Sequence, residues 1–128
     1  MEKYMKLAYE ESIKAYKKNE VPVGAIIIKN NKIIAKAKNN RQKKHNILGH
    51  AEINCIQKAE KKLKDWRLND CVMYVTLEPC NMCSEIIKES RIKEVVFLIS
   101  KNGEVNNKYT ELADKYSKIM KQFFANLR

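Results

Sequence analysis

The sequence predicts an α/β fold, a three-layer α/β/α sandwich around a central mixed sheet of four or five strands. Segments whose apolar residues recur with the helical period of 3.6 alternate along the chain with segments of the strand period of 2. The resulting order, α-β-β-α-β-α-β-α, contains β-α-β units, which require right-handed parallel crossovers. A length of 128 residues, with no repeat and no linker rich in Gly, Pro or Ser, predicts one domain over residues 1–128.

The first 38 residues predict a helix followed by a β-hairpin. Residues 2–18 carry an apolar stripe at helical spacing, formed by Met5, Ala8, Tyr9, Ile13 and Tyr16. Residues 21–29 (VPVGAIIIK) and 32–37 (KIIAKA) are typical of strands. Asn30 and Asn31 between them indicate a tight hairpin turn.

The middle of the chain predicts a polar loop, a helix, a strand and a second helix. The loop covers residues 39–49, and the helix runs from His50 to about Lys62. Residues 71–77 (CVMYVTL) are rich in β-branched and aromatic side chains, which favour a strand. Pro79 indicates the start of the next helix, where its missing N–H costs nothing.

The last third of the chain predicts one more strand and one more helix. Residues 94–99 (EVVFLI) are short and almost wholly apolar, which predicts a central, parallel strand. Residues 110–127 predict a helix with a buried stripe, formed by Leu112, Tyr116, Ile119, Met120, Phe123 and Leu127.

Charge and apolar patterning indicate a cytoplasmic protein with no membrane partner. The longest apolar runs, 25–28 and 95–99, are far shorter than the roughly 18 residues of a spanning helix, and the charged N-terminal segment lacks the apolar core of a secretory signal. The four cysteines are therefore expected as thiols or metal ligands. The net charge of +11 indicates a polyanionic partner, nucleic acid first, although abundant lysine on solvated helix faces is the alternative.

Cys80 and Cys83 are the first candidates for chemistry. Their spacing places both sulfurs on one side of the first turn of a helix, whose N-terminus favours thiolates. Such a pair is found in redox dithiols, in structural zinc sites and in catalytic metal sites, and alone does not separate them.

His50 supplies a possible third ligand. It begins its own helix, and two strand-to-helix junctions of one parallel sheet lie at the same sheet edge. One nitrogen and two sulfurs suit zinc, and three protein ligands leave a position for water. A structural site needs a fourth ligand, for which the candidates are His45, Cys55 and Cys71.

Glu52, two residues after His50, favours the catalytic alternative. A carboxylate there can reach a zinc-activated water without binding the metal and can transfer its proton. The competing interpretation is a carboxylate that only stabilises the helix N-terminus. Together the residues form the pattern H-x-E…P-C-x-x-C of zinc nucleobase deaminases.

With these residues the sequence resembles the cytidine/deoxycytidylate deaminase superfamily, and more closely the bacterial tRNA-specific adenosine deaminases. The matching segments cover about residues 1–98 and the late Phe-Phe helix, and they read EVPVGAIII, HAEI, WRL, MYVTLEPCNMC, SRI and VVF. The resemblance implies a cytidine deaminase-like fold and hydrolytic conversion of adenosine to inosine at the wobble position of the tRNA anticodon loop. It also implies one Zn²⁺ per chain and a homodimer.

The resemblance also implies roles for particular residues. His50, Cys80 and Cys83 match the zinc ligands and Glu52 the proton shuttle. Three further positions match residues around the base: Asn39, which hydrogen-bonds it, Ala51, through its backbone N–H, and Val23. Basic side chains expected near the RNA are Lys36, Lys38, Arg41, Lys43, Lys44, Lys115, Lys118, Lys121 and Arg128.

Two other functions stay open, and the sequence departs from the family at its C-terminal end. The same chemistry serves deaminases of free bases, nucleosides or nucleotides, of guanine, cytosine or cytidine type; a zinc-stabilised, non-catalytic RNA-binding subunit is the third hypothesis, which the presence of Glu52 disfavours. After Ile99 the family's long loop is mostly deleted, so the last strand is expected to be short or missing.

Overall fold

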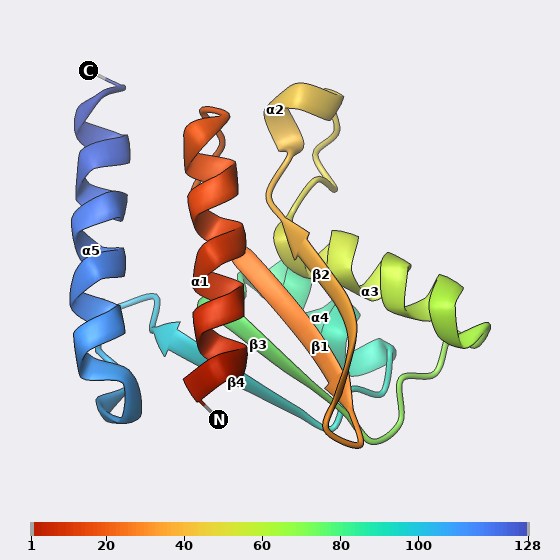
Figure 1. The fold of residues 1–128 in the computed structure, drawn as a ribbon. Coiled ribbons are helices and arrows are strands. Elements are labelled where there is room, and N and C mark those ends of the chain that lie inside the picture. The colour runs from red at the N-terminus through yellow and green to blue at the C-terminus, as the bar shows by residue number, and fades with distance from the viewer. Residues whose placement is uncertain (1, 128) are drawn as a thin grey trace.

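A computed structural model, which describes residues 2–127, places one mixed sheet between two layers of helices (Figure 1). The strands are β1 (Gly24–Lys29), β2 (Lys32–Lys38), β3 (Cys71–Leu77) and β4 (Glu94–Ile99), in the order β2-β1-β3-β4. β1 is antiparallel to both of its neighbours, whereas β3 and β4 are parallel. The predicted three-layer sandwich with a mixed sheet of four or five strands is therefore confirmed, with four.

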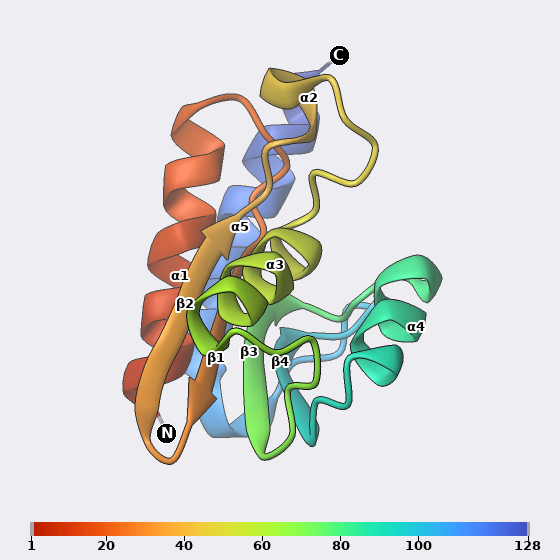
Figure 2. The same cartoon turned by 90° about the vertical axis from the view of Figure 1, so that its right-hand side faces the viewer.

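Two helices cover each face of the sheet. α1 (Glu2–Lys17) and α5 (Thr110–Ala125) lie side by side on one face (Figure 1). α3 (Ala51–Leu63) and α4 (Asn81–Glu89) lie on the other face, as the view turned by 90° also shows (Figure 2). None of the helices within residues 2–127 is both long and apolar enough to cross a membrane.

The central position of β1 explains why its segment GAIII contains no polar residue. Successive side chains of a strand point to opposite faces. Ala25 and Ile27 pack on the side of α3 and α4, whereas Ile26 and Ile28 pack on the side of α1 and α5. Both faces are covered by helices, so all five residues of GAIII are buried, and only Lys29 at the end of the strand is partly exposed.

β4 differs from its prediction in one respect. It is parallel to β3, as expected, but it lies at the edge of the sheet rather than in the centre. Its middle residues are only half-buried, and full burial is limited to Leu98 and Ile99. An edge strand covered by helices on both faces has the same apolar run as a central strand. The apolar pattern indicates which faces of a strand are buried, but it does not indicate how many strands pair with it.

The chain after β4 contains no fifth strand within the described residues. Val105 forms an isolated antiparallel bridge to Ile99, and a short 3₁₀ turn, η1 (Asn107–Tyr109), then leads into α5. This agrees with the expectation that the last strand is short or missing.

Three smaller differences concern helices. The predicted polar loop contains a short helix, α2 (Arg41–Lys44). The helix expected to open at Pro79 begins at Asn81, with Cys80 at its N-cap. In the last helix Leu127, assigned to the buried stripe, is 68% exposed, because the helix ends at Ala125 before that position reaches the sheet.

The order of the strands determines where the candidate site lies. β1 reverses direction relative to both neighbours, so β2, β3 and β4 all run the same way. The carboxyl ends of β2 and β3 therefore meet at one edge of the sheet, although β1 separates them. α3 and α4 begin at this edge, where α/β folds place their sites.

Candidate active site

His50 is the N-cap of α3 and is held by the polar loop that precedes it. Its backbone is extended, with φ −84° and ψ 145°. The Asn40 N–H donates to the Gly49 carbonyl at 2.9 Å, and the Asn54 side chain donates to the Asn40 side chain at 2.8 Å. A Cβ on Gly49 would lie 2.6 Å from the Cα of Arg41, so only glycine allows the loop to close this tightly. These contacts fix the backbone from which the imidazole extends.

Cys80 and Cys83 are held by the first turn of α4. Cys80 is the extended N-cap residue, and its carbonyl accepts from the Ser84 N–H at 2.8 Å. The preceding turn is fixed through Glu78, whose N–H donates to the Ile99 carbonyl and whose carboxylate accepts from the Lys101 N–H. Glu78 therefore joins the turn before the cysteines to the chain after β4.

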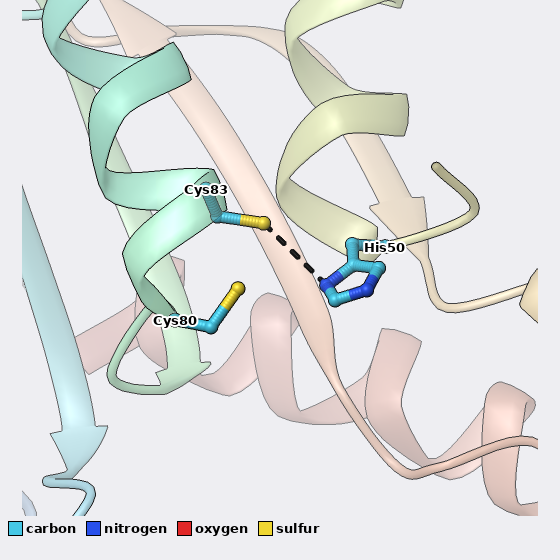
Figure 3. A group of neighbouring side chains, drawn as sticks. All are labelled: His50, Cys80 and Cys83. Atoms are coloured by element: carbon cyan, nitrogen blue, oxygen red, sulfur yellow. Dashed lines mark hydrogen bonds between the residues drawn. The ribbon is translucent and has the colours of Figure 1, made fainter. Parts of the chain in front are cut away.

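The three predicted ligands converge on one point (Figure 3). The ligand atoms of His50, Cys80 and Cys83 all lie within 4.8 Å of one another, a group that could hold a metal ion. The Cys83 Sγ lies 3.5 Å from the His50 Nδ1. Tetrahedral zinc, with Zn–S near 2.3 Å and Zn–N near 2.0–2.1 Å, separates a sulfur and a nitrogen ligand by about 3.5 Å. The arrangement fits zinc without rearrangement of this pair.

The electrostatics of the group favour a bound cation. Burial and then the charge of Arg41 lower the pKa of His50, which favours the neutral imidazole that a metal requires. Burial, then the nearby Glu52 carboxylate, raises the pKa of Cys83. A thiolate at this position therefore needs a positive ion beside it.

None of the candidates for a fourth ligand joins the group. His45 is exposed at the C-cap of α2. Cys55 is fully buried, with its Sγ 3.6 Å from the Ala25 carbonyl oxygen. Cys71 begins β3 and so lies at the opposite end of the sheet. Within residues 2–127 the candidate group thus consists of these three residues, and a tetrahedral ion held by them would keep one position open for water.

Glu52 lies in the first turn of α3 and is 4% exposed. Burial raises its pKa to about 7. A carboxyl group with this pKa exchanges its proton readily at neutral pH, which suits a general acid and base.

The three residues expected around the base occupy neighbouring backbone positions. Asn39 follows β2 and is 6% exposed, and its N–H donates to the Val23 carbonyl at 3.0 Å. Ala51 is the first residue of α3, fully buried and directly after His50. The structure therefore joins Asn39 to Val23 and places Ala51 beside the metal-ligand group.

A groove of about 1030 Å³ begins at Asn39 and runs between α2 and the end of α5. Five of its lining residues are basic: Lys18, Lys38, Arg41, Lys43 and Lys44. Four are apolar, Val21, Phe123, Phe124 and Leu127. Of the other expected basic residues, Lys115 lies in a separate pocket with Lys3 and Lys6, and Arg128 lies outside the described residues.

Sequence reasoning missed Glu20. It is 2% exposed, and its carboxylate accepts from the N–H groups of Gln42 and Lys43 at 3.0 and 2.8 Å. It thereby anchors α2 to the connection between α1 and β1. An acidic residue that directly precedes the apolar VPVG segment, in a chain with net charge +11, was the available signal.

Comparison with known families shows to which family the chain belongs. The family model described as MafB19-like deaminase matches residues 1–128. The chain belongs to this deaminase family. The predicted resemblance to bacterial tRNA-specific adenosine deaminases is also confirmed, because curated proteins of that name are similar over most of the chain.

Two such relatives show the extent of the similarity. A tRNA-specific adenosine deaminase of Bacillus subtilis is 47% identical over 96 residues, which cover 75% of this chain and 60% of the relative. One from Aquifex aeolicus is 37% identical over 99% of this chain and 95% of the relative.

Two solved structures of similar fold carry different names. One comes from a study of A-to-I editing by tRNA:A34 deaminases at the wobble position of transfer RNA. It has a TM-score of 0.76 and 32% identity, over 84% of this chain and 85% of that one. The other is guanine deaminase from Bacillus subtilis, with a TM-score of 0.75 and 33% identity, over 79% of this chain and 65% of that one.

Proposed function

We propose that the protein is a zinc-dependent, single-domain hydrolase that converts adenosine to inosine at the wobble position of a tRNA anticodon loop. The observation that carries the proposal is the group of His50, Cys80 and Cys83, with the buried Glu52 two residues from the histidine. The relatives named tRNA-specific adenosine deaminase support the choice of substrate.

The proposed reaction adds water to C6 of adenine and releases ammonia. His50, Cys80 and Cys83 would hold one zinc ion, which supplies a water acidic enough to react at neutral pH. Glu52 would take one proton from the attacking water and deliver it to the ring nitrogen N1. It would then take the proton of the hydroxyl now bound to C6 and deliver it to the departing amine. The elements balance, since adenosine and water give inosine and ammonia, and Glu52 ends in its initial protonation state.

The base would be held by the residues joined at the end of β2. Asn39 donates and accepts hydrogen bonds at the base edge, the Ala51 N–H supplies a further donor, and Val23 packs against the ring. Because Asn39 is bonded through its backbone to Val23, these contacts come from one rigid unit.

The basic groove supports an RNA substrate over a free base. Its lysines and Arg41 suit phosphates, and Phe123 and Phe124 offer aromatic surface beside them. A nucleotide in a single-stranded anticodon loop leaves the stack at low cost, which allows the base to reach a buried site. A free purine such as guanine is the second candidate, favoured by the similarity to guanine deaminase. Cytosine and cytidine have no comparable support here.

The protein is further proposed to be a cytoplasmic homodimer. A groove of about 400 Å³ between α3 and α4 is lined by the apolar side chains of Ile53, Ile56, Ile86 and Trp66 and by the polar Gln57, Glu60, Glu85, Glu89 and Ser90. Trp66 is 51% exposed and stacks with the guanidinium groups of Arg67 and Arg91. An exposed aromatic beside apolar side chains is typical of a protein interface, and a second copy of the chain is the proposed occupant. A monomeric mass in analytical ultracentrifugation of the active protein would remove the dimer from the proposal.

The deciding experiment is a substrate panel with metal analysis. Purified protein is expected to carry about one zinc per chain, as three ligands and an open position require. It is incubated with an anticodon stem-loop that has adenosine at the wobble position, and separately with guanine, cytosine and cytidine. Inosine from the stem-loop alone supports the proposal. Turnover of guanine alone would assign the second candidate, and an active protein without zinc would overturn both.

A further inference from the structure

The connection between α1 and β1 contains Val23, one of the residues proposed to contact the base, directly after the buried Pro22. The Tyr116 hydroxyl, from the middle of α5, donates to the Pro22 carbonyl oxygen at 2.6 Å. Both side chains are fully buried. The two residues are 94 positions apart in sequence, so α5 reaches across the molecule to hold this segment.

The same segment is held at a second point. The Gly24 N–H donates to the Thr76 hydroxyl at 3.2 Å. Pro22 and Gly24, two residues apart, are thus held by Tyr116 and Thr76 respectively. Water is excluded from this place, so removal of the phenolic hydroxyl leaves the Pro22 carbonyl without a donor.

Val23, the residue between the two anchors, connects this network to the site. Its carbonyl accepts from the Asn39 N–H at 3.0 Å, and both residues are proposed to touch the base. Thr76 lies on β3, four residues before Cys80. Burial raises the pKa of Tyr116.

We infer that Tyr116 is a positioning residue of the deaminase. Together with Thr76, and through Pro22, it fixes the hydrogen-bonded pair Val23 and Asn39 against which the base is aligned. The inference rests on the proposed function, because the position of this pair matters only if a base is bound there. α5 is then not only a covering helix, since it determines the geometry of the site from the opposite face of the sheet.

The test is the variant Tyr116→Phe, which removes one oxygen and keeps the aromatic ring. Its matched control is Tyr4→Phe. Tyr4 is 2% exposed, and its hydroxyl donates to a backbone carbonyl, that of Asn31, at 2.9 Å. This contact lies at the hairpin, the end of the sheet away from the metal-ligand group. The two variants lose the same kind of bond at different distances from the site.

For each variant kcat, the Kd for the stem-loop, zinc content and Tm are measured. Tyr116→Phe is expected to lower kcat at least about tenfold relative to Tyr4→Phe, because a small displacement of the bound base from the reacting groups slows the chemical step strongly. The Kd is expected to stay within about twofold, since phosphate contacts dominate RNA affinity. Zinc content is expected to match that of the control.

Each outcome supports or overturns the inference. A kcat equal to that of Tyr4→Phe overturns it, as does a fall in both variants that follows their Tm values. If Tyr116→Phe gives no zinc-loaded protein, Thr76→Val, which removes the other hydroxyl of the network, is compared in the same way. Wild-type protein that makes no inosine would instead refute the proposed function, so the two failures are distinguishable.

Discussion

Replacement of Glu20 by alanine is expected to release α2 and weaken RNA binding without a change in the chemical step. The Glu20 carboxylate accepts from two consecutive N–H groups of α2, at 2.8 and 3.0 Å. α2 is only four residues long and has no side-chain hydrogen bond at its own N-cap. Its position therefore depends on contacts from outside the helix.

The size of the effect follows from these contacts. A hydrogen bond to a charged group contributes about 1.5–3 kcal/mol when its partner is otherwise unsatisfied. Gln42 and Lys43 are exposed, so water replaces part of what is lost, and the expected fall in the free energy of unfolding is about 2 kcal/mol. In a chain of this length this corresponds to a decrease in Tm of roughly 7 °C.

The effect on RNA comes from the cations that α2 carries. Arg41, Lys43 and Lys44 line the groove, and each phosphate contact to a single strand contributes about 0.7 to the slope of log K against log salt concentration. Loss of all three contacts would reduce the slope by about 2. Urea unfolding and stem-loop titrations at several salt concentrations measure both quantities.

Glu10→Ala is the matched control, because it makes the same change in net charge at an exposed position of α1. Glu20→Ala is expected to lower stability and salt slope relative to this control, while kcat at saturating RNA stays the same. If stability and slope equal those of Glu10→Ala, the carboxylate does not hold α2 and the reasoning is refuted.

Three further predictions concern the metal, the proton shuttle and the packing of β1. Glu52→Gln is expected to retain zinc and fold but to lose about 10²–10⁴-fold in kcat; unchanged turnover would remove Glu52 from the mechanism. Chelation of the metal is expected to abolish activity and lower Tm, with recovery on addition of zinc, since the ion binds only the folded group; a Tm indifferent to chelator would contradict the site. Gly24→Ala is expected to lower the free energy of unfolding, measured with urea, by about 1–3 kcal/mol or more. The added Cβ would overlap the Ala8 carbonyl and lie 2.6 Å from the Ser12 N. A stability equal to that of the wild type would show that α1 can shift.

The convergence of His50, Cys80 and Cys83 could be expected from the sequence because the constraint on each residue is local. A histidine at one helix start and a Cys-x-x-Cys pair at another need only a shared sheet edge to meet. This expectation rests on two junctions of one parallel sheet. The sheet is mixed, but β2 and β3 point the same way with antiparallel β1 between them, so their carboxyl ends lie at one edge. The direction of the strands, and not their adjacency, brings the ligands together.

Features that depend on distant parts of the chain were not predictable in this way. The edge position of β4 depends on which strand pairs with β3, and hydrophobic periodicity does not encode this. The contacts of Glu20 with α2 and of Tyr116 with Pro22 join segments 22 and 94 residues apart. In the sequence Tyr116 is one apolar position of a helical stripe, and its hydroxyl acquires a partner only once α5 is placed on the sheet.

The described chain after Ile99 contains no further strand, yet α5 still packs on the sheet. The exposed edge of β4 would otherwise offer unpaired backbone groups. Here the Asn106 N–H donates to the Leu98 carbonyl and its side chain donates to the Phe97 carbonyl, so one asparagine closes the end of the edge nearest the site. α5 begins directly afterwards and is fixed at its middle by Tyr116, which allows its far end to meet the groove beside α2. The placement of α5 therefore depends on these two anchors, so changes at Asn106 or Tyr116 are expected to lower kcat more than changes in the exposed turn at 101–104.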